Sequence, residues 1–317
     1  MPKTHPLAQF WSSIAELEAK RKSKIFALVH SHQDPDHNHI CGPTLNCIIQ
    51  QRKLIKTVEK IELLLHTPGG SADIAFRAVK FFRARAKVLN VIVPIMAKSA
   101  GTLMCLGADN IYMGEFAELG PLDVQLGDPL KRGSKMLSPL DEFKSAEFLR
   151  DYAVEVFDFI TATILRRSGM SVQEAIHESV PFATSIMRPL YEQLDPLQIG
   201  EHRRSLAIGE DYGRRLLNTV ANPLADEIVQ KLVSGYPSHE FVIDREEASR
   251  IGLPIRSLDA RQEHTLITAL EGILQNEATV HGFVPQAPPT KKPKGSAQAA
   301  SRTTDEKPAA KPALVAS

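Results

Sequence analysis

The stretch from residue 61 to residue 106 reads IELLLHTPGGSADIAFRAVKFFRARAKVLNVIVPIMAKSAGTLMCL and decides the fold. Its apolar runs at 61–65 and 88–95 predict buried strands, and apolar side chains recur at helical spacing between them. Residues 110–113 indicate a third strand. Strands and helices that alternate within about 55 residues are typical of an α/β fold whose sheet is largely parallel.

The segments outside this stretch extend the same pattern and interrupt it once. Residues 25–29 predict an earlier strand, while 241–243 and 244–250 predict a late strand and a closing helix. A long helix is expected from Ser138 to Arg167, since Ser138 can cap it and a proline follows at its first position. Its apolar face would consist of Phe148, Tyr152, Val156, Phe159 and Ile160.

These patterns divide the chain into three segments. We expect an N-terminal helical segment at 1–23, an α/β domain at 24–285 with a helical insertion of about 138–235, and a tail at 286–317. The tail lacks aromatic residues and is rich in Pro, Ala, Lys, Ser and Thr, which predicts disorder. It carries six basic residues against two acidic ones, so it could serve as a solvated tether or as an electrostatic docking arm.

Composition excludes several classes of partner. The chain has 317 residues, 43% hydrophobic content and a formal net charge of +1, so no global field would attract nucleic acid or an anionic membrane. Its three cysteines form neither a CxxC pair nor an even framework, and no disulfide scaffold is expected. Without a membrane-spanning run or a secretory signal pattern, we expect a cytoplasmic protein.

Ser99 lies where a buried strand gives way to a helix, with small residues on its C-terminal side. A hydroxyl at such a turn sits near free backbone N–H groups and the positive end of the helix dipole, which favour developing negative charge. These are suitable surroundings for a nucleophile. Serine is also a frequent helix cap, and the local pattern by itself leaves both interpretations open.

Gly69 and Gly70 follow Pro68 at the end of the preceding strand. Successive parallel strands end at the same edge of a sheet, so this turn should lie beside Ser99. Glycines there allow backbone N–H groups to face a cleft that a side chain would block. The two turns together therefore predict a nucleophile next to an oxyanion hole, although Pro-Gly-Gly is also an ordinary turn sequence.

Three motifs in order carry a family resemblance: HTPGGS at 66–71, AKSAGT at 97–102 and LGPLDVQ at 119–125. They resemble the serine dehydrogenase proteinases, a family similar to signal peptide peptidase A and to the proteolytic subunit of Clp protease. The resemblance is close over about residues 60–126 and weaker over 238–253. It implies a ClpP/crotonase-like hydrolase domain and a serine endopeptidase that forms homo-oligomers and acts on proteins or peptides without a cofactor.

The resemblance also implies roles for individual residues. Ser99 would be the nucleophile, the N–H groups of Gly70 and Ala100 would form the oxyanion hole, and Gly69 would shape the turn. The Clp subunit has its histidine base about 25 residues after the nucleophile, where this chain has Asp123 and no histidine. Near the usual position of the acid it has His239 instead.

We therefore expect an exchanged Ser99–His239–Asp123 relay, in which an imidazole takes the serine proton and a carboxylate fixes its tautomer. Equally, His239 could be a structural histidine and Asp123 a turn residue. Relatives resembling signal peptide peptidase A use a lysine base, and Lys144 is the alternative here. The acidic residues Asp141, Glu142 and Glu147 close to Lys144 in the sequence would keep its ammonium charged.

Other functions were weighed against a peptidase. The His- and Asp-rich run at 30–39 could ligate a metal, but its spacing differs from known signatures, and a polar loop is the expected structure. A crotonase-type acyl-thioester enzyme would need the oxyanion hole but not Ser99. An inactive scaffold of the same fold would fit the absence of a histidine near residue 123.

Overall fold

A computed structural model describes residues 6–31, 38–55, 57–122, 139–275 and 279–285, with the backbone alone for 139–144 and 202. The predicted disorder of the tail falls outside these residues. The main sheet has six strands in the order β7-β5-β3-β2-β1-β8, and only β8 is antiparallel to its neighbour. The strands are β1 (Lys24–Val29), β2 (Val58–His66), β3 (Ala86–Val93), β5 (Asn110–Met113), β7 (Ile255–Ser257) and β8 (Val280–Phe283). The predicted α/β fold with a largely parallel sheet is confirmed.

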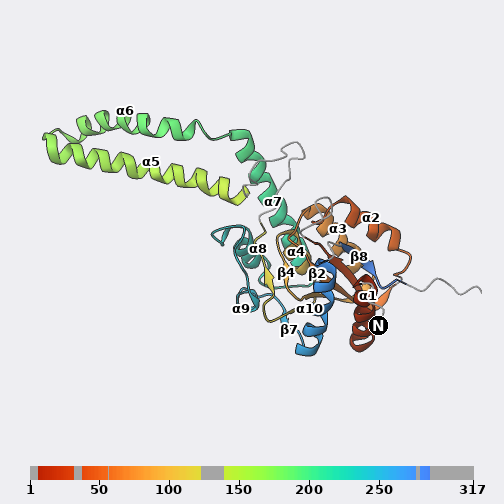
Figure 1. Ribbon diagram of the computed structural model, residues 1–317. Coiled ribbons are helices and arrows are strands. Elements are labelled where there is room, and N and C mark those ends of the chain that lie inside the picture. The colour runs from red at the N-terminus through yellow and green to blue at the C-terminus, as the bar shows by residue number, and fades with distance from the viewer. Residues whose placement is uncertain (1–5, 32–37, 56, 123–138, 276–278, 286–317) are drawn as a thin grey trace, which may run out of the picture. The chain divides into compact units, whose positions relative to one another are not determined.

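Both faces of the central strands are buried, as the continuous apolar runs require. Because side chains alternate along a strand, Leu63 and Leu65 of β2 enter one core cluster and Leu64 enters the other. Helices α1 (Pro6–Arg21) and α10 (Ala260–Leu274) pack together and supply the second cluster, with Phe10 and Leu270 fully buried (Figure 1). The first cluster receives α2 (Gly42–Gln51), α3 (Ala72–Arg83) and α4 (Ala100–Cys105).

A buried carboxylate ties α1 to the sheet. Glu62 of β2 is 0% exposed and accepts hydrogen bonds from Arg21 at 2.7 Å, Ser23 at 2.6 Å and Asn90 at 3.2 Å. Burial acts to raise the pKa of Glu62, but the hydrogen bonds and the charge of Arg21 outweigh it and hold the pKa below its ordinary value. Glu62 is thus a paired structural ion at the middle of the sheet.

Four long helices follow the third motif: α5 (Pro139–Ser168), α6 (Val172–Tyr191), α7 (Pro196–Thr219) and α8 (Ala225–Ser234). Helices α5 and α6 run side by side (Figure 1), and α6 buries a stripe of residues spaced four apart, Ala175, Ser179, Ala183 and Met187. The predicted apolar face of α5 is wrong in part, because Phe148, Tyr152 and Phe159 are exposed. Val156 and Ile160 of that face are half-buried in the helix, which contacts α6 and α7.

The end of the domain differs most from prediction. Residues 241–243 form only a bridge between Ile243 and Leu119, not a strand. The helix α9 (Arg245–Arg250) is confirmed and is capped by Asp244, but it does not close the fold, since β7, α10 and β8 come after it. Two short strands near the third motif, β4 (Met96–Ala97) and β6 (Glu118–Leu119), pair in parallel. Among the helices that the structure describes, none combines the length and apolar character needed to cross a bilayer.

Candidate active site

Two turns meet at the carboxyl edge of the parallel sheet, as the sequence predicts. After β2, Thr67 donates its N–H to the carbonyl of Met96 at 3.1 Å and accepts from the N–H of Lys98 at 3.0 Å. On its other side, this segment pairs with Ile40 through a bridge at Gly70. The glycine turn therefore lies directly against the backbone that leads into Ser99.

Ser99 has a strained backbone at the N-cap position of α4, and its side chain does not cap the helix. Its φ is 49° and its ψ is −115°, and its side chain makes no capping hydrogen bond to α4. A capping serine would be extended and would accept from the first turn of the helix, so the cap interpretation is wrong. A positive φ at a residue other than glycine costs about 1–3 kcal/mol and persists only where the surroundings enforce it. Ser99 is 4% exposed, and α4 behind it is buried throughout.

Gly69 faces Ser99 at a distance that excludes any side chain. A Cβ on Gly69 would stand 2.7 Å from the Ser99 Cβ and 2.9 Å from the Lys98 carbonyl oxygen, and its φ is +119°. At Gly70, with φ +131°, a Cβ would stand 2.4 Å from the Ile40 carbonyl oxygen. Both positions therefore require glycine for space as well as for backbone angle.

The hydrogen-bond register orients the N–H of Gly70. The Gly69 carbonyl accepts from Ile40 N–H at 2.7 Å, and Ser71 N–H donates to the Ile40 carbonyl at 2.8 Å. In a parallel bridge of this kind the central residue directs its own N–H to the opposite side of the strand. For Gly70 that side is the one on which Thr67 pairs with the segment leading to Ser99.

The third motif is fastened to the Ser99 turn through Thr102. The Thr102 hydroxyl lies 2.8 Å from the Ala97 carbonyl and 2.9 Å from the Gly120 carbonyl, and it accepts from Gly120 N–H at 3.0 Å. The motif that contains Ser99 is thus in contact with both of the other motifs behind the family resemblance.

Lys98 fixes the segment that contains His239. Its ammonium pairs with Glu118 at 3.1 Å and donates to the Glu240 carbonyl at 3.4 Å, with 12% of its side chain exposed. Next to it, Leu119 and Ile243 exchange two backbone hydrogen bonds. The half-buried His239 therefore belongs to a segment held beside the third motif and the Ser99 turn. Nothing in the local sequence pattern predicts this structural role of Lys98.

Two candidate residues fall outside what the structure describes. Asp123 belongs to the undescribed residues 123–138, and Lys144 lies in α5 with its backbone alone described. Among the described residues, no three His, Cys, Asp or Glu side chains are grouped so that they could hold a metal ion, and residues 32–37 are not among them.

His30, the first residue of the run at 30–39 for which a polar loop is expected, is buried. It follows β1 directly and is 0% exposed, and its Nδ1 lies 2.8 Å from the Thr67 hydroxyl. Burial, followed by the charges of His281, His39 and His66, lowers the pKa of His30 from 6.5 to about 2. The imidazole is therefore neutral at physiological pH.

The lowered pKa of His30 makes the free energy of unfolding decrease in acid. Because the pKa of His30 is depressed in the folded state, its contribution to stability is complete above pH 6.5 and is lost as the pH falls toward 2. At pH 4.5 the loss should reach about 2.5 kcal/mol. Urea unfolding of wild type and of His30→Gln at pH 7 and pH 4.5 checks this, and the variant should lose less stability. Identical losses in the two proteins would contradict it.

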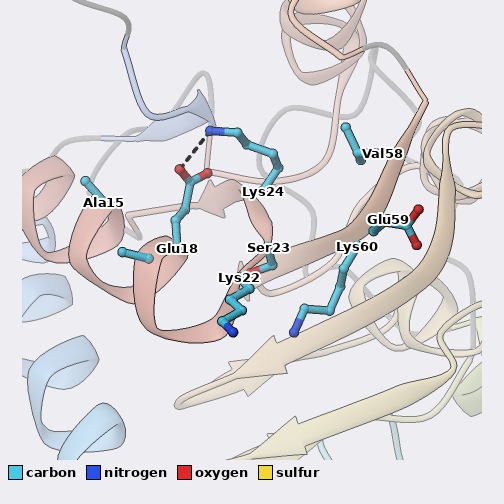
Figure 2. A pocket seen from close by; sticks show the side chains of 9 residues that line it. Ala15, Glu18, Lys22, Ser23, Lys24, Val58, Glu59 and Lys60 are labelled. Atoms are coloured by element: carbon cyan, nitrogen blue, oxygen red, sulfur yellow. Dashed lines mark hydrogen bonds and ion pairs between the residues drawn. The ribbon is translucent and has the colours of Figure 1, made fainter.

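A cavity of about 420 Å³ lies at the opposite edge of the sheet, where β1 and β2 begin. Figure 2 shows lysine and glutamate side chains around it, and Lys24 pairs there with Glu18 at 3.2 Å. Because positive and negative side chains both line it, the cavity favours neither anionic nor cationic ligands. Because it is at the amino ends of the strands, it is separate from the Ser99 turn.

Comparisons with known proteins identify the family of the chain. A strained serine at the carboxyl edge of a parallel sheet is an arrangement that α/β hydrolases use for a nucleophile. The model of the ClpP-like SDH-type serine proteinases matches residues 3–164, just over half of the chain. The chain therefore belongs to the family of ClpP-like SDH-type serine proteinases, and the resemblance seen in the sequence is confirmed.

Individual relatives are more distant. The chain is 25% identical to an uncharacterised protein of Methanocaldococcus jannaschii over 86% of its own length and 82% of that protein's. A second uncharacterised protein of that organism is 22% identical over 80% and 74%. Among solved structures, a mutant of the 1510-N membrane-bound stomatin-specific protease is 20% identical, with a TM-score of 0.27, over 49% of this chain and 67% of that one. The ClpP protease catalytic domain from Plasmodium falciparum is 11% identical, with a TM-score of 0.39, over 82% and 93%.

Proposed function

We propose that the protein is a serine endopeptidase that hydrolyses peptide bonds through an acyl-enzyme on Ser99. The observation that carries this proposal is the strained, nearly buried Ser99, which is held against the Gly69–Gly70 turn and makes no capping bond. A serine that served only structure would relax to an ordinary cap, whereas nucleophilic serines of α/β hydrolases occupy such strained turns. Membership of a serine proteinase family supports the same activity.

The chemistry follows from the groups at the turn. The Ser99 oxygen attacks the scissile carbonyl carbon while a base takes its proton, and the N–H groups of Gly70 and Ala100 donate to the resulting oxyanion. The tetrahedral intermediate collapses, the C–N bond breaks, and the base returns the proton to the departing amine. Water then attacks the ester on Ser99 by the same route and releases the acid.

We propose His239 as the base and Asp123 as the carboxylate that fixes its tautomer. The contact between Lys98 and the Glu240 carbonyl supports this assignment, because it ties the residue after His239 to the residue before Ser99. The alternative base remains Lys144. Near the amino end of α5, its ammonium would have to lose its charge to act, which the helix dipole there assists.

Two variants separate these bases. His239→Ala should lower kcat for a fluorogenic peptide by at least about 10²-fold, because proton transfer loses its acceptor. Lys144→Ala should leave kcat within about threefold, because on this assignment the lysine takes no part in the proton transfer. Steady-state turnover at pH 6–9 measures both. The reverse ranking would transfer the role to Lys144.

The proposed function itself is tested by incubating wild type with casein and following new amino termini. Cleavage that a fluorophosphonate abolishes supports it. A folded protein that neither cleaves casein or short peptides nor reacts with fluorophosphonates would be a scaffold instead.

A further inference from the structure

A chain of hydrogen bonds runs from the edge of the sheet to the glycine turn. His281 of β8 places its Nε2 3.0 Å from the Nε2 of His30, and the His30 Nδ1 lies 2.8 Å from the Thr67 hydroxyl. That hydroxyl accepts from the N–H of Gly69 at 3.1 Å. The four residues come from three different segments of the chain, and His30 and Thr67 are both 0% exposed.

Thr67 contacts both turns of the site. Its backbone pairs with Met96 and Lys98 of the segment that leads to Ser99. A Cβ added to Gly101 would stand 2.6 Å from the Thr67 methyl group, so this methyl group packs against the first turn of α4. Its hydroxyl holds the N–H of Gly69. A single side chain thus fixes the distance between the glycine turn and the nucleophile turn.

The histidines restrict the orientation of the Thr67 hydroxyl. A neutral imidazole has one N–H, so His30 either accepts from the Thr67 O–H and donates to His281 or does the reverse. If His30 instead donates its Nδ1–H to the Thr67 oxygen, the Thr67 hydroxyl donates to the Gly69 carbonyl oxygen, which lies 3.4 Å away. In both arrangements a lone pair of the Thr67 oxygen faces Gly69 N–H, so the turn is held in one orientation.

We propose that Thr67, oriented by His30 and His281, is a positioning residue for the oxyanion hole. By fixing the Gly69 peptide it directs the N–H of Gly70 toward the carbonyl oxygen of the substrate. This inference rests on the proposed peptidase function for its effect on rate. Its effect on the turn itself can be measured without any substrate.

Thr67→Val removes the hydroxyl at nearly constant volume, and Thr67→Ser keeps the hydroxyl without the methyl group. We expect Thr67→Val to lower kcat by about 10- to 100-fold with KM within about twofold, because the oxyanion hole acts mainly in the transition state. Thr67→Ser should recover kcat to within about threefold of wild type. Amide hydrogen exchange at residues 68–71, followed by mass spectrometry, should accelerate at least tenfold in the valine variant and remain near wild type in the serine variant.

The measurements of kcat and of amide exchange together separate a failure of the positioning role from a failure of the proposed function. Unchanged exchange and unchanged kcat in Thr67→Val would overturn the inference, and so would equal losses in the valine and serine variants. If wild type proves inactive while Thr67→Val still accelerates exchange, the positioning role stands and the proposed function falls. Should Thr67→Val fail to fold, His281→Phe on the edge strand provides the second variant. It should shift both readings in the same direction by a smaller factor, and no shift in either would count against the inference.

Discussion

Replacing Ser99 with alanine is expected to abolish peptide turnover, lowering kcat by at least about 10³-fold. The reason is chemical, because the acyl-enzyme route needs an oxygen at this position and the methyl group of alanine offers none. Folding should survive the change, since the Ser99 side chain makes no capping bond that alanine would lose. Turnover of a fluorogenic peptide and thermal unfolding, measured on the same sample, check both statements.

Ser71 supplies the matched control. Ser71 directly follows the glycine turn, and it caps α3 by accepting from Ile74 N–H at 3.4 Å. Ser71→Ala should therefore cost about 1 kcal/mol of stability and leave kcat within about threefold. If Ser99→Ala retained turnover, or if both serines affected stability and activity alike, Ser99 would not be the nucleophile.

The second large effect is expected for Gly69→Ala. The new methyl group would stand 2.7 Å from the Ser99 Cβ, and its backbone would keep a φ of +119° that alanine rarely adopts. Because one neighbour is backbone and the other is the base of the nucleophile's side chain, relief must come from moving the Ser99 turn itself. We expect kcat to fall by at least about 10²-fold, as a displacement of about 1 Å at a reacting group produces.

A glycine-to-alanine substitution at Gly200 is the matched control, and it is expected to raise stability. Gly200 lies inside α7, and the nearest atom to an added Cβ there is Arg204 Nη1 at 3.7 Å. Gly200→Ala should raise the free energy of unfolding by about 0.5–1 kcal/mol and leave kcat unchanged. Full activity in Gly69→Ala would contradict the close approach of the two turns.

Local signals in the sequence were sufficient for the four central strands of the sheet, β5, β3, β2 and β1, and for the meeting of its turns. The apolar runs of β2 and β3 are buried on both faces, and such runs have no amphipathic period to misread. Proline and glycine mark the end of β2. Because parallel strands end at one edge, the proximity of Gly69 to Ser99 followed from topology without coordinates.

The features that sequence missed depend on contacts between distant segments. His30 opens a polar run in the sequence, yet it is buried, with Thr67 and His281 from distant segments against its ring. The strand β8 itself is four residues long and contains a histidine and a glycine, which gives almost no strand signal. In α5, which packs against α6 and α7, Phe148 and Phe159 stay exposed although their spacing in the sequence predicted a buried face. The backbone strain at Ser99 has no sequence signature, because serine is favoured at ordinary caps as well.

The central claim, that Ser99 is a nucleophile activated at this turn, is tested most directly by covalent labelling. The folded protein is incubated with a fluorophosphonate, digested, and the modified peptide is identified by tandem mass spectrometry. The account predicts one adduct per chain on the Ser99 oxygen, and no adduct in Ser99→Ala. A folded wild-type protein that stays unmodified across pH 6–9, or that carries its adduct on another residue while Ser99 remains free, would contradict it.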